Sequence, residues 1–193
     1  MIKVDYRELI KGLEARLSPK RFKHTLGVSE TALLLAGKYG VDQEKAKLAG
    51  LLHDYARELP METLLHQAVV LALPVDEIER EEPVLLHAKI GMHLVKQECG
   101  VEDDDILQAI SLHTTGSSHM STLAKIIFLA DYIEPGRDFE GVAALRKAAH
   151  TNLDKAMLLA YDYTISHIIA KHGFIHPNTI IGRNYLLMQE RIN

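Results

Sequence analysis

Histidine and aspartate stand side by side where an apolar helix face would be expected to continue. His53 and Asp54 follow the alanine-rich run AKLAGLL, and the 193-residue chain carries 11 histidines, a high number for an otherwise ordinary composition. Histidine is the commonest metal ligand and the usual proton carrier near neutral pH. The doublet therefore raises the question of metal chemistry.

The same kind of residue recurs in other helical segments. At spacings of three and four residues, five segments each direct a histidine or a carboxylate toward their own apolar face. The set comprises His24, the doublet His53 and Asp54, His87, His113 and Asp131. A single histidine on such a face is more often bonded to a backbone carbonyl, but a buried carboxylate needs a compensating charge or donor. A metal cation would supply that charge at all of these positions together.

The ligand types narrow the choice of metal. Imidazole and carboxylate groups without a thiolate suit iron, manganese, zinc, cobalt or nickel. One catalytic ion must keep room for water and substrate, so the full set favours two ions that share Asp54, with His53 beside it in the same catalytic site. Two ions ~3.5–4 Å apart can hold a hydroxide between them and stabilise the leaving oxygen of an in-line displacement.

Longer stretches of the chain resemble a known family. His24, the doublet His53 and Asp54, and Asp131 resemble the HD-domain metal-dependent phosphohydrolases, and His87 and His113 resemble the subset that binds two ions. The segments KRFKHTLGV, AGLLHDYARE, LLHAKIG, AISLHTTG, KIIFLADYIEPGRDFEGV and HPNTIIGRNYLL, which together cover nearly the whole chain, are similar to the bacterial YqeK family.

This resemblance implies a function and a division of the ligands. YqeK proteins resemble symmetrical diadenosine tetraphosphate hydrolases with an iron-dependent site, which cut the tetraphosphate in the middle to give two ADP. The resemblance implies that one ion is held by His24, His53, Asp54 and Asp131, and the other by Asp54, His87 and His113.

Basic residues near these ligands are candidates for binding the substrate phosphates. Arg57 stands three residues after Asp54, where many HD phosphohydrolases carry a lysine, and its guanidinium adds a bidentate fork. Arg137 lies in a turn with glycine and proline after Asp131, so it can fold back toward the site. The further candidates are Lys20, Thr114, Thr115 and His119, with Arg21 and Lys23 behind them. For each of these residues, a surface or loop position is the alternative.

Other functions stay open at this point. A different HD-type nucleotide phosphohydrolase or phosphodiesterase would carry the same ligands, and the base pocket that separates these enzymes cannot be located from spacing. A non-catalytic metal- and nucleotide-binding regulatory module is a third reading. His176, Arg183 and Asn184 have either a capping and packing role or a role in closure over a nucleotide.

Helical periodicity through nearly the whole chain predicts an all-α fold, a compact helical bundle with a buried metal site. Helices are expected over about 5–17, 19–39, 42–55, 61–72, 83–98, 103–113, 121–133 and 178–191, with two more over 141–171 that break near 151. DEIEREEP is expected to be an acidic connector. One HD domain is expected over 1–193, with a core of about 18–135 on which C-terminal helices of about 141–193 pack.

Composition and charge argue against several classes of partner. The formal net charge of −4 argues against non-specific nucleic-acid or anionic-membrane binding, and Cys99 as the single cysteine permits no intrachain disulfide. No apolar run reaches the ~18–20 residues of a membrane span, and the charged N-terminus lacks a secretory apolar region. A cytoplasmic protein that acts on a small-molecule nucleotide is expected. The segment AMLLAYDYTISHIIA is either a homodimer interface or core.

Overall fold

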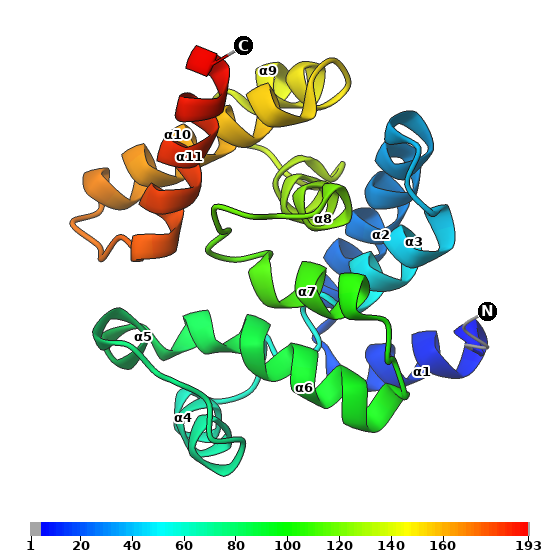
Figure 1. Ribbon diagram of the computed structural model, residues 1–193. Helices are drawn as coiled ribbons and strands as arrows, with labels where there is room; N and C mark the ends of the chain where they lie inside the picture. Colours follow the sequence, from blue (N-terminus) through cyan, green and yellow to red (C-terminus); the bar gives the residue numbers. More distant parts are fainter. Residues whose placement is uncertain (1–4, 193) are drawn as a thin grey trace.

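The computed structural model describes residues 5–192, and no strand occurs within that range. Figure 1 shows helices packed around a centre to which α2, α3, α6, α7 and α8 contribute. The elements are α1 (Tyr6–Arg16), α2 (Pro19–Tyr39), α3 (Gln43–Leu52), α4 (Met61–Val70), α5 (Glu77–Glu81), the 3₁₀ turn η1 (Pro83–Leu86), α6 (His87–Cys99), α7 (Asp104–Leu112), α8 (Thr122–Ile133), α9 (Val142–Ala149), α10 (Leu153–Ala170) and α11 (Pro177–Ile192). The predicted all-α fold is confirmed.

Side chains at the helix ends explain where the helices start. Asp5, Ser18, Asp42 and Asp103 accept hydrogen bonds from backbone N–H groups in the first turns of α1, α2, α3 and α7. Such caps satisfy amide groups that have no partner within the helix. The Ser18 cap and the terminating Gly40, which has a φ of 68°, account for the bounds of α2, which match the helix expected over about 19–39.

Two expected helix boundaries and one expected connector are wrong. Helix α3 ends at Leu52, because the following residues form tighter turn bonds, from Tyr55 N to the Leu52 oxygen and from Arg57 N to the Asp54 oxygen. The segment expected as an acidic connector contains α5, which starts with a capping box between Asp76 and Glu79. The helix expected from Pro83 starts at His87, after the 3₁₀ turn η1. The first and third differences place His53 and His87 at helix ends.

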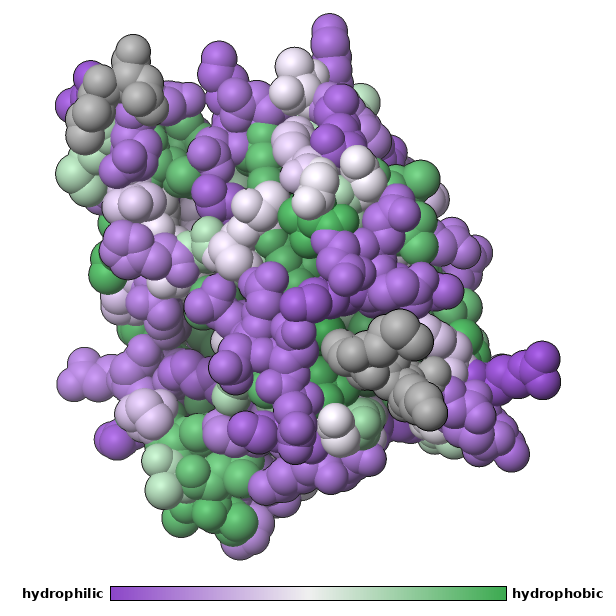
Figure 2. All heavy atoms as spheres, turned by 45° about the vertical axis from the view of Figure 1, so that its right-hand side comes forward, coloured by the Kyte–Doolittle hydropathy of each residue, from purple (hydrophilic) through white to green (hydrophobic). Residues whose placement is uncertain are grey.

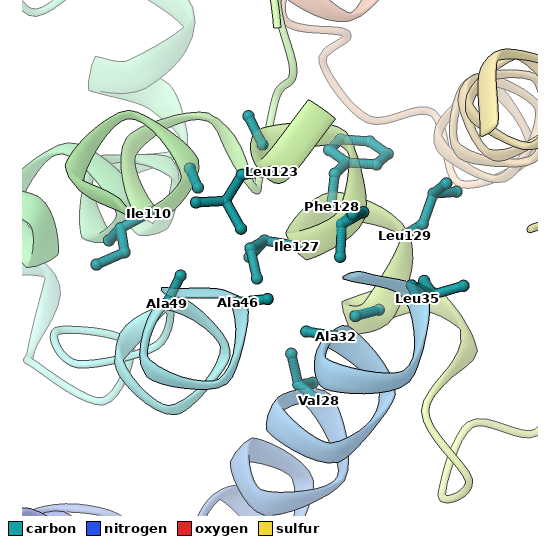
Figure 3. Close-up of a cluster of buried hydrophobic side chains, with 14 of the residues drawn as sticks. Val28, Ala32, Leu35, Ala46, Ala49, Ile110, Leu123, Ile127, Phe128 and Leu129 are labelled. Atoms are coloured by element: carbon teal, nitrogen blue, oxygen red, sulfur yellow. The ribbon is translucent and has the colours of Figure 1, made fainter. Parts of the chain in front are cut away.

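The main core lies where α2, α3, α7 and α8 meet. Figure 3 shows Val28, Ala32 and Leu35 of α2 beside Ala46 and Ala49 of α3, with Ile110 of α7 and Phe128 of α8 completing the cluster. Small residues on α3 allow a close approach, since a Cβ atom at Gly50 would lie 2.7 Å from the Cα of Ser29 in α2. This tight contact brings the end of α3, and so His53 and Asp54, close to α2.

The apolar stripe of α10 belongs to the interior of the protein. Ala156, Met157, Ala160 and Tyr161 are buried, and α10 packs against α8, α9 and α11. The segment AMLLAYDYTISHIIA is therefore core over this stripe, and the homodimer stays a prediction. None of the helices within residues 5–192 is both long and apolar enough to cross a membrane.

Exposed apolar side chains gather instead on α4. Met61, Leu65, Val69 and Val70 are all exposed. Figure 2 shows a mainly hydrophilic face with a hydrophobic patch at its lower edge, at the height of α4 in Figure 1. This patch lies on the periphery of the molecule, away from the central helices that carry the predicted ligands.

Candidate metal centre

The predicted ligands converge at the centre of the helical bundle. His24 lies within α2 and Asp131 within α8, while the others lie at helix ends. His53 and Asp54 directly follow α3, His87 is the first residue of α6, and His113 directly follows α7. His53, Asp54, His87 and His113 are all buried, with exposed fractions of 0% to 4%.

The two carboxylate oxygens of Asp54 face different groups of ligands. Its Oδ1 atom lies 3.3 Å from His87 Nε2 and 3.7 Å from His113 Nε2. Its Oδ2 atom lies 3.3 Å from His53 Nε2 and 3.8 Å from His24 Nε2. Asp131 Oδ1 adds to this second group, 2.9 Å from His24 Nε2 and 4.0 Å from His53 Nε2. Asp54 is thus shared between two clusters of donor atoms.

Backbone carbonyls fix three of the imidazole rings. The Nδ1 atoms of His53, His87 and His113 lie 2.7, 2.5 and 2.7 Å from the carbonyl oxygens of the residues three positions earlier, Gly50, Val84 and Ile110. A carbonyl oxygen only accepts hydrogen bonds, so each Nδ1 carries the proton. Each Nε2 therefore directs a lone pair toward the centre, which is the tautomer that a metal ligand requires.

The surroundings of the histidine Nε2 atoms show whether cations fit in the centre. His87 Nε2 and His113 Nε2 are 3.0 Å apart, so with both Nδ1 atoms protonated the two lone pairs repel each other. The Nε2 atoms of His24 and His53 are buried without a hydrogen-bond partner. Buried polar atoms rarely lack partners, and a divalent cation in each cluster would satisfy them. Donor atoms of His24, His53 and Asp131, and of His53, Asp54 and His113, lie close enough to share an ion.

The electrostatics of the pocket favour positive charge. Burial opposes the charged form of His53, yet the adjacent Asp54 and Asp131 carboxylates raise the pKa of this histidine above its ordinary value. Burial raises the pKa of Asp54, but the proximity of His53, His113 and His87 outweighs it and holds that pKa well below the usual range. Burial lowers the pKa of His87, which keeps its ring neutral and its lone pair available near neutral pH.

Glu134 is a site residue that the sequence interpretation missed. Its Oε1 atom accepts a hydrogen bond from His24 Nδ1 at 3.1 Å, and its Oε2 atom accepts one from the Gly136 N–H at 2.5 Å. A Cβ atom at Gly27 would lie 2.7 Å from Glu134 Oε2, so a glycine there makes room for the carboxylate. The available signal was the spacing from Asp131 to Glu134, which is one helical turn on α8 and its C-terminal cap.

The loop after α8 is held in place by one arginine that the sequence interpretation also missed. The Arg146 Nε atom donates to the Ile133 oxygen at 2.9 Å, and its Nη2 atom donates to the Glu134 and Arg137 oxygens at 2.8 and 2.9 Å. These bonds fix the main chain on both sides of the turn that follows Asp131. Arg146 therefore positions Glu134 and Arg137 through direct hydrogen bonds to their main chain.

Two predicted phosphate-binding arginines have different surroundings. Arg137 folds back as expected, and its Nε and Nη2 atoms donate to the Asp131 main-chain oxygen at 2.6 Å and to Oδ1 at 2.5 Å. Arg57 is half-buried one turn beyond Asp54, and its side chain makes no ion pair within residues 5–192. Lys20 is exposed and likewise has no ion-pair partner in that range. The basic residue that reaches Asp54 is its neighbour Arg21, whose Nη1 atom lies 2.8 Å from Oδ2.

Of the candidate residues in the loop after α7, Thr114 lies near the ligands, whereas Thr115 and His119 make contacts elsewhere. The Thr114 hydroxyl lies 3.2 Å from His113 Nε2 and 3.4 Å from His87 Nε2, beside the second cluster. The Thr115 hydroxyl donates to the Gly116 oxygen, which is a local contact. His119 is exposed, and its ring meets the Tyr185 ring edge-on, with centroids 4.8 Å apart.

A separate cluster contains residue types that could hold a metal ion, namely Asp76, Glu79 and His176. Its side chains are instead engaged in hydrogen bonds and ion pairs. The Asn178 backbone N–H donates to His176 Nδ1 at 3.1 Å, so the proton of this ring is on Nε2, which faces Asp76 Oδ2 at 2.9 Å. Lys89 Nζ already neutralises Glu79 at 2.5 Å. These contacts tie the start of α11 to α5, which favours packing as the role of His176.

Arg183 and Asn184 lie in the last helix, α11. Arg183 pairs with Asp162 of α10 through its Nε atom, and Asn184 is exposed. The Arg183 contact joins α11 to α10, so packing also accounts for this residue.

Replacing Glu134 with glutamine is expected to weaken metal binding on the order of 10- to 100-fold, because carboxylates behind ligating histidines commonly contribute that much. A glutamine amide has a single acceptor oxygen, so it can accept from His24 Nδ1 or from the Gly136 N–H but not from both. Competition between E134Q and a chelator for Mn²⁺ measures the change. E140Q, at an exposed position in the same loop, is the matched control and should bind like the wild type. Unchanged affinity in E134Q would contradict the assigned role.

Known proteins are similar to this chain in sequence and in structure. The HD domain family matches residues 21–136. The chain is 43% identical over 182 residues to the symmetrical bis(5'-nucleosyl)-tetraphosphatase of Halalkalibacterium halodurans, covering 93% of this chain and 95% of that protein. It is 38% identical to the protein of the same name from Bacillus subtilis, covering 93% and 96%. The crystal structure of a predicted HD superfamily hydrolase involved in NAD metabolism from Clostridium acetobutylicum superposes with a TM-score of 0.94 at 46% identity, covering 96% of this chain and 98% of that one.

Proposed function

This chain belongs to the HD domain family, and from that premise we propose that it is a metal-dependent hydrolase that cleaves diadenosine tetraphosphate symmetrically into two ADP. The observation that carries the proposal is the Asp54 carboxylate, whose two oxygens face separate clusters of imidazole lone pairs. The relatives from Halalkalibacterium halodurans and Bacillus subtilis are symmetrical bis(5'-nucleosyl)-tetraphosphatases by name, which supports the choice of substrate.

The residues that would hold the cations follow from the two clusters. His24, His53 and Asp131 lie on the Oδ2 side of Asp54, and His87 and His113 lie on its Oδ1 side. Two divalent first-row ions, with iron as the family resemblance implies, would activate a water molecule and stabilise negative charge on the phosphate and the leaving group. Manganese, cobalt, nickel and zinc share the required preference for nitrogen and oxygen donors.

The remaining steps belong to the side chains that surround these ligands. Arg57 and Arg137 supply guanidinium groups for the phosphate oxygens, and such groups match phosphate geometry with two parallel hydrogen bonds. The Thr114 hydroxyl, near His87 and His113, can donate to a phosphate oxygen at the Oδ1 side. Glu134 keeps the proton of His24 on Nδ1. Burial of Asp54 and the histidines limits competing water, which strengthens each of these electrostatic interactions.

The reaction consumes one water molecule and breaks one phosphoanhydride bond. Water oxygen attacks an inner phosphorus, the bond to the oxygen that bridges to the other half opens, ADP leaves with that oxygen, and the protons of the water are released to solvent. The second ADP carries the oxygen that came from water. Because cleavage falls in the middle of the chain of four phosphates, both products are the same nucleotide.

Product analysis tests the proposal directly. Purified protein loaded with Fe²⁺ under anaerobic conditions is incubated with diadenosine tetraphosphate, and the nucleotides are separated by chromatography. We expect ADP as the single product, at two molecules per substrate consumed, and no product after removal of the metal with a chelator. AMP together with ATP would show asymmetric cleavage and contradict the proposal. Turnover of another nucleotide in its place would favour a different HD phosphohydrolase activity.

A further inference from the structure

Arg21 is the basic residue in closest contact with the shared carboxylate. Its Nη1 atom lies 2.8 Å from Asp54 Oδ2, and its side chain is 28% exposed while that of Asp54 is 4% exposed. The guanidinium therefore has one edge against the site and is accessible from solvent. Arg21 lies in the first turn of α2, one turn before His24.

Most of the hydrogen-bonding capacity of Arg21 is unused. A guanidinium has several N–H donors in a planar fork, and the bond to Asp54 is the one hydrogen bond that this side chain makes within residues 5–192. Arg137 differs, because it spends two nitrogen atoms on Asp131. An oxyanion that enters from solvent can therefore bind the free donors of Arg21 without breaking the contact with Asp54.

The negative charge of the carboxylates in the pocket explains why a positively charged donor is needed there. Asp54, Asp131 and Glu134 bring three carboxyl groups to the region where a polyphosphate must approach. Each would repel an incoming phosphate unless a cation stands between them. Arg21 adds positive charge at Asp54 to that of the two proposed ions, and its planar fork is pre-organised for phosphate in a way that a flexible lysine is not.

A second residue fixes the backbone that carries Arg21. The Glu58 carboxylate accepts hydrogen bonds from the Ser18 backbone N–H at 2.5 Å and from its hydroxyl at 2.6 Å. The Ser18 hydroxyl in turn accepts the Arg21 N–H at 3.4 Å, as the cap of α2. Glu58 directly follows Arg57, so one carboxylate links the segment after Asp54 to the first turn of α2.

We propose that Arg21, in place of the predicted Lys20, binds the polyphosphate beside Asp54, and that Glu58 is a positioning residue that holds Arg21 there through Ser18. The inference rests on the proposed function for the class of ligand, a nucleoside polyphosphate. The contact itself requires only a phosphate group at the metal-loaded site.

Binding of ADP to the Mn²⁺-loaded protein, measured by calorimetry, tests the role of Arg21. R21Q is expected to weaken ADP binding on the order of 10- to 100-fold, since a hydrogen bond to a charged group is worth about that factor. K20Q makes the same change of charge one residue earlier and is expected to bind ADP within about twofold of the wild type. R21K should fall between R21Q and the wild type, because it keeps the charge and loses the fork.

Metal affinity shows whether the site survives the substitution. R21Q should bind Mn²⁺ at least as tightly as the wild type, because the change removes a positive charge next to Asp54. Loss of Mn²⁺ binding would make Arg21 a support of the ligand set and overturn the proposal. Equal loss of ADP affinity in K20Q and R21Q, or unchanged affinity in R21Q, would also overturn it.

A double-mutant cycle tests Glu58. E58A alone should weaken ADP binding about 3- to 10-fold, and in the R21Q background it should cause little further loss, because it acts through Arg21. A purely structural role would lower ADP affinity by the same factor in both backgrounds, and that result would overturn the positioning role.

The outcomes also separate this inference from the proposed function. If the wild type binds ADP in an Arg21-dependent manner yet does not cleave diadenosine tetraphosphate symmetrically, the proposed function fails and the role of Arg21 stands. If the wild type makes two ADP while R21Q keeps full ADP affinity, the proposed function stands and the role of Arg21 fails.

Discussion

Asp54→Asn is expected to lower hydrolysis by at least about 1,000-fold and to abolish tight binding of metal at both clusters. The neutral amide keeps the size of the side chain but removes the charge that both clusters share, since Oδ1 faces His87 and His113 and Oδ2 faces His53 and His24. Charge stabilisation by metal ions is worth several kcal/mol in such reactions, which corresponds to factors of this size.

The measurement combines turnover with metal content after gel filtration. Far-ultraviolet circular dichroism should show the helical content of the wild type, because Asp54 lies in a turn after α3 and contributes no helix cap. Asp138→Asn is the matched control, since it makes the same change at an exposed carboxylate in the loop after α8. Retained activity together with full metal content in D54N would remove Asp54 from the site.

Removal of one histidine from the Oδ1 side is expected to reduce the metal content from two ions to one. His87 and His113 face only this oxygen of Asp54, while His24, His53 and Asp131 lie on the other side. His87→Ala and His113→Ala should therefore each lose one ion, keep the other, and lower the hydrolysis rate by about 100-fold or more, because each ion contributes several kcal/mol.

Elemental analysis of the gel-filtered variants measures the stoichiometry. His93→Ala provides the control, since His93 lies on the same helix as His87 but is only half-buried and makes no contact with Asp54. His24→Ala should produce the opposite pattern and keep the ion on the Oδ1 side. If H87A lost both ions, or kept both with full activity, the division of the ligands by the two oxygens of Asp54 would be wrong.

The fold class followed from local features of the chain. Amphipathic periodicity marked most helices, and Ser18 and Asp42 cap the helices that were expected to begin at about residues 19 and 42. These signals work because backbone hydrogen bonds in a helix are local, so each helix end depends on residues within one turn. Periodicity also placed the predicted ligands on inward faces, which is why all of them meet in the structure.

The tertiary structure differs from the expected helix boundaries at the end of α3 and at the start of α6. The tight turn bonds after Leu52 end α3 before His53, and the 3₁₀ turn at Pro83 delays the start of α6 to His87. Both changes allow a histidine ring, that of His53 or His87, to donate a hydrogen bond from Nδ1 to the carbonyl oxygen three residues earlier. A periodic pattern cannot reveal this feature, because it assumes that the helix continues.

The sequence by itself determined the all-α architecture and the types of residue that can bind metal, because helix formation and ligand chemistry depend on near neighbours and on side-chain type. Only the tertiary structure decided that Glu134 stands behind His24, that Arg146 holds the turn after Asp131, and that Arg21 rather than Lys20 reaches Asp54. Those contacts join residues on different elements, and their distances depend on how helices pack. Adjacent residues on α2 face different directions, so spacing alone could not choose between Lys20 and Arg21.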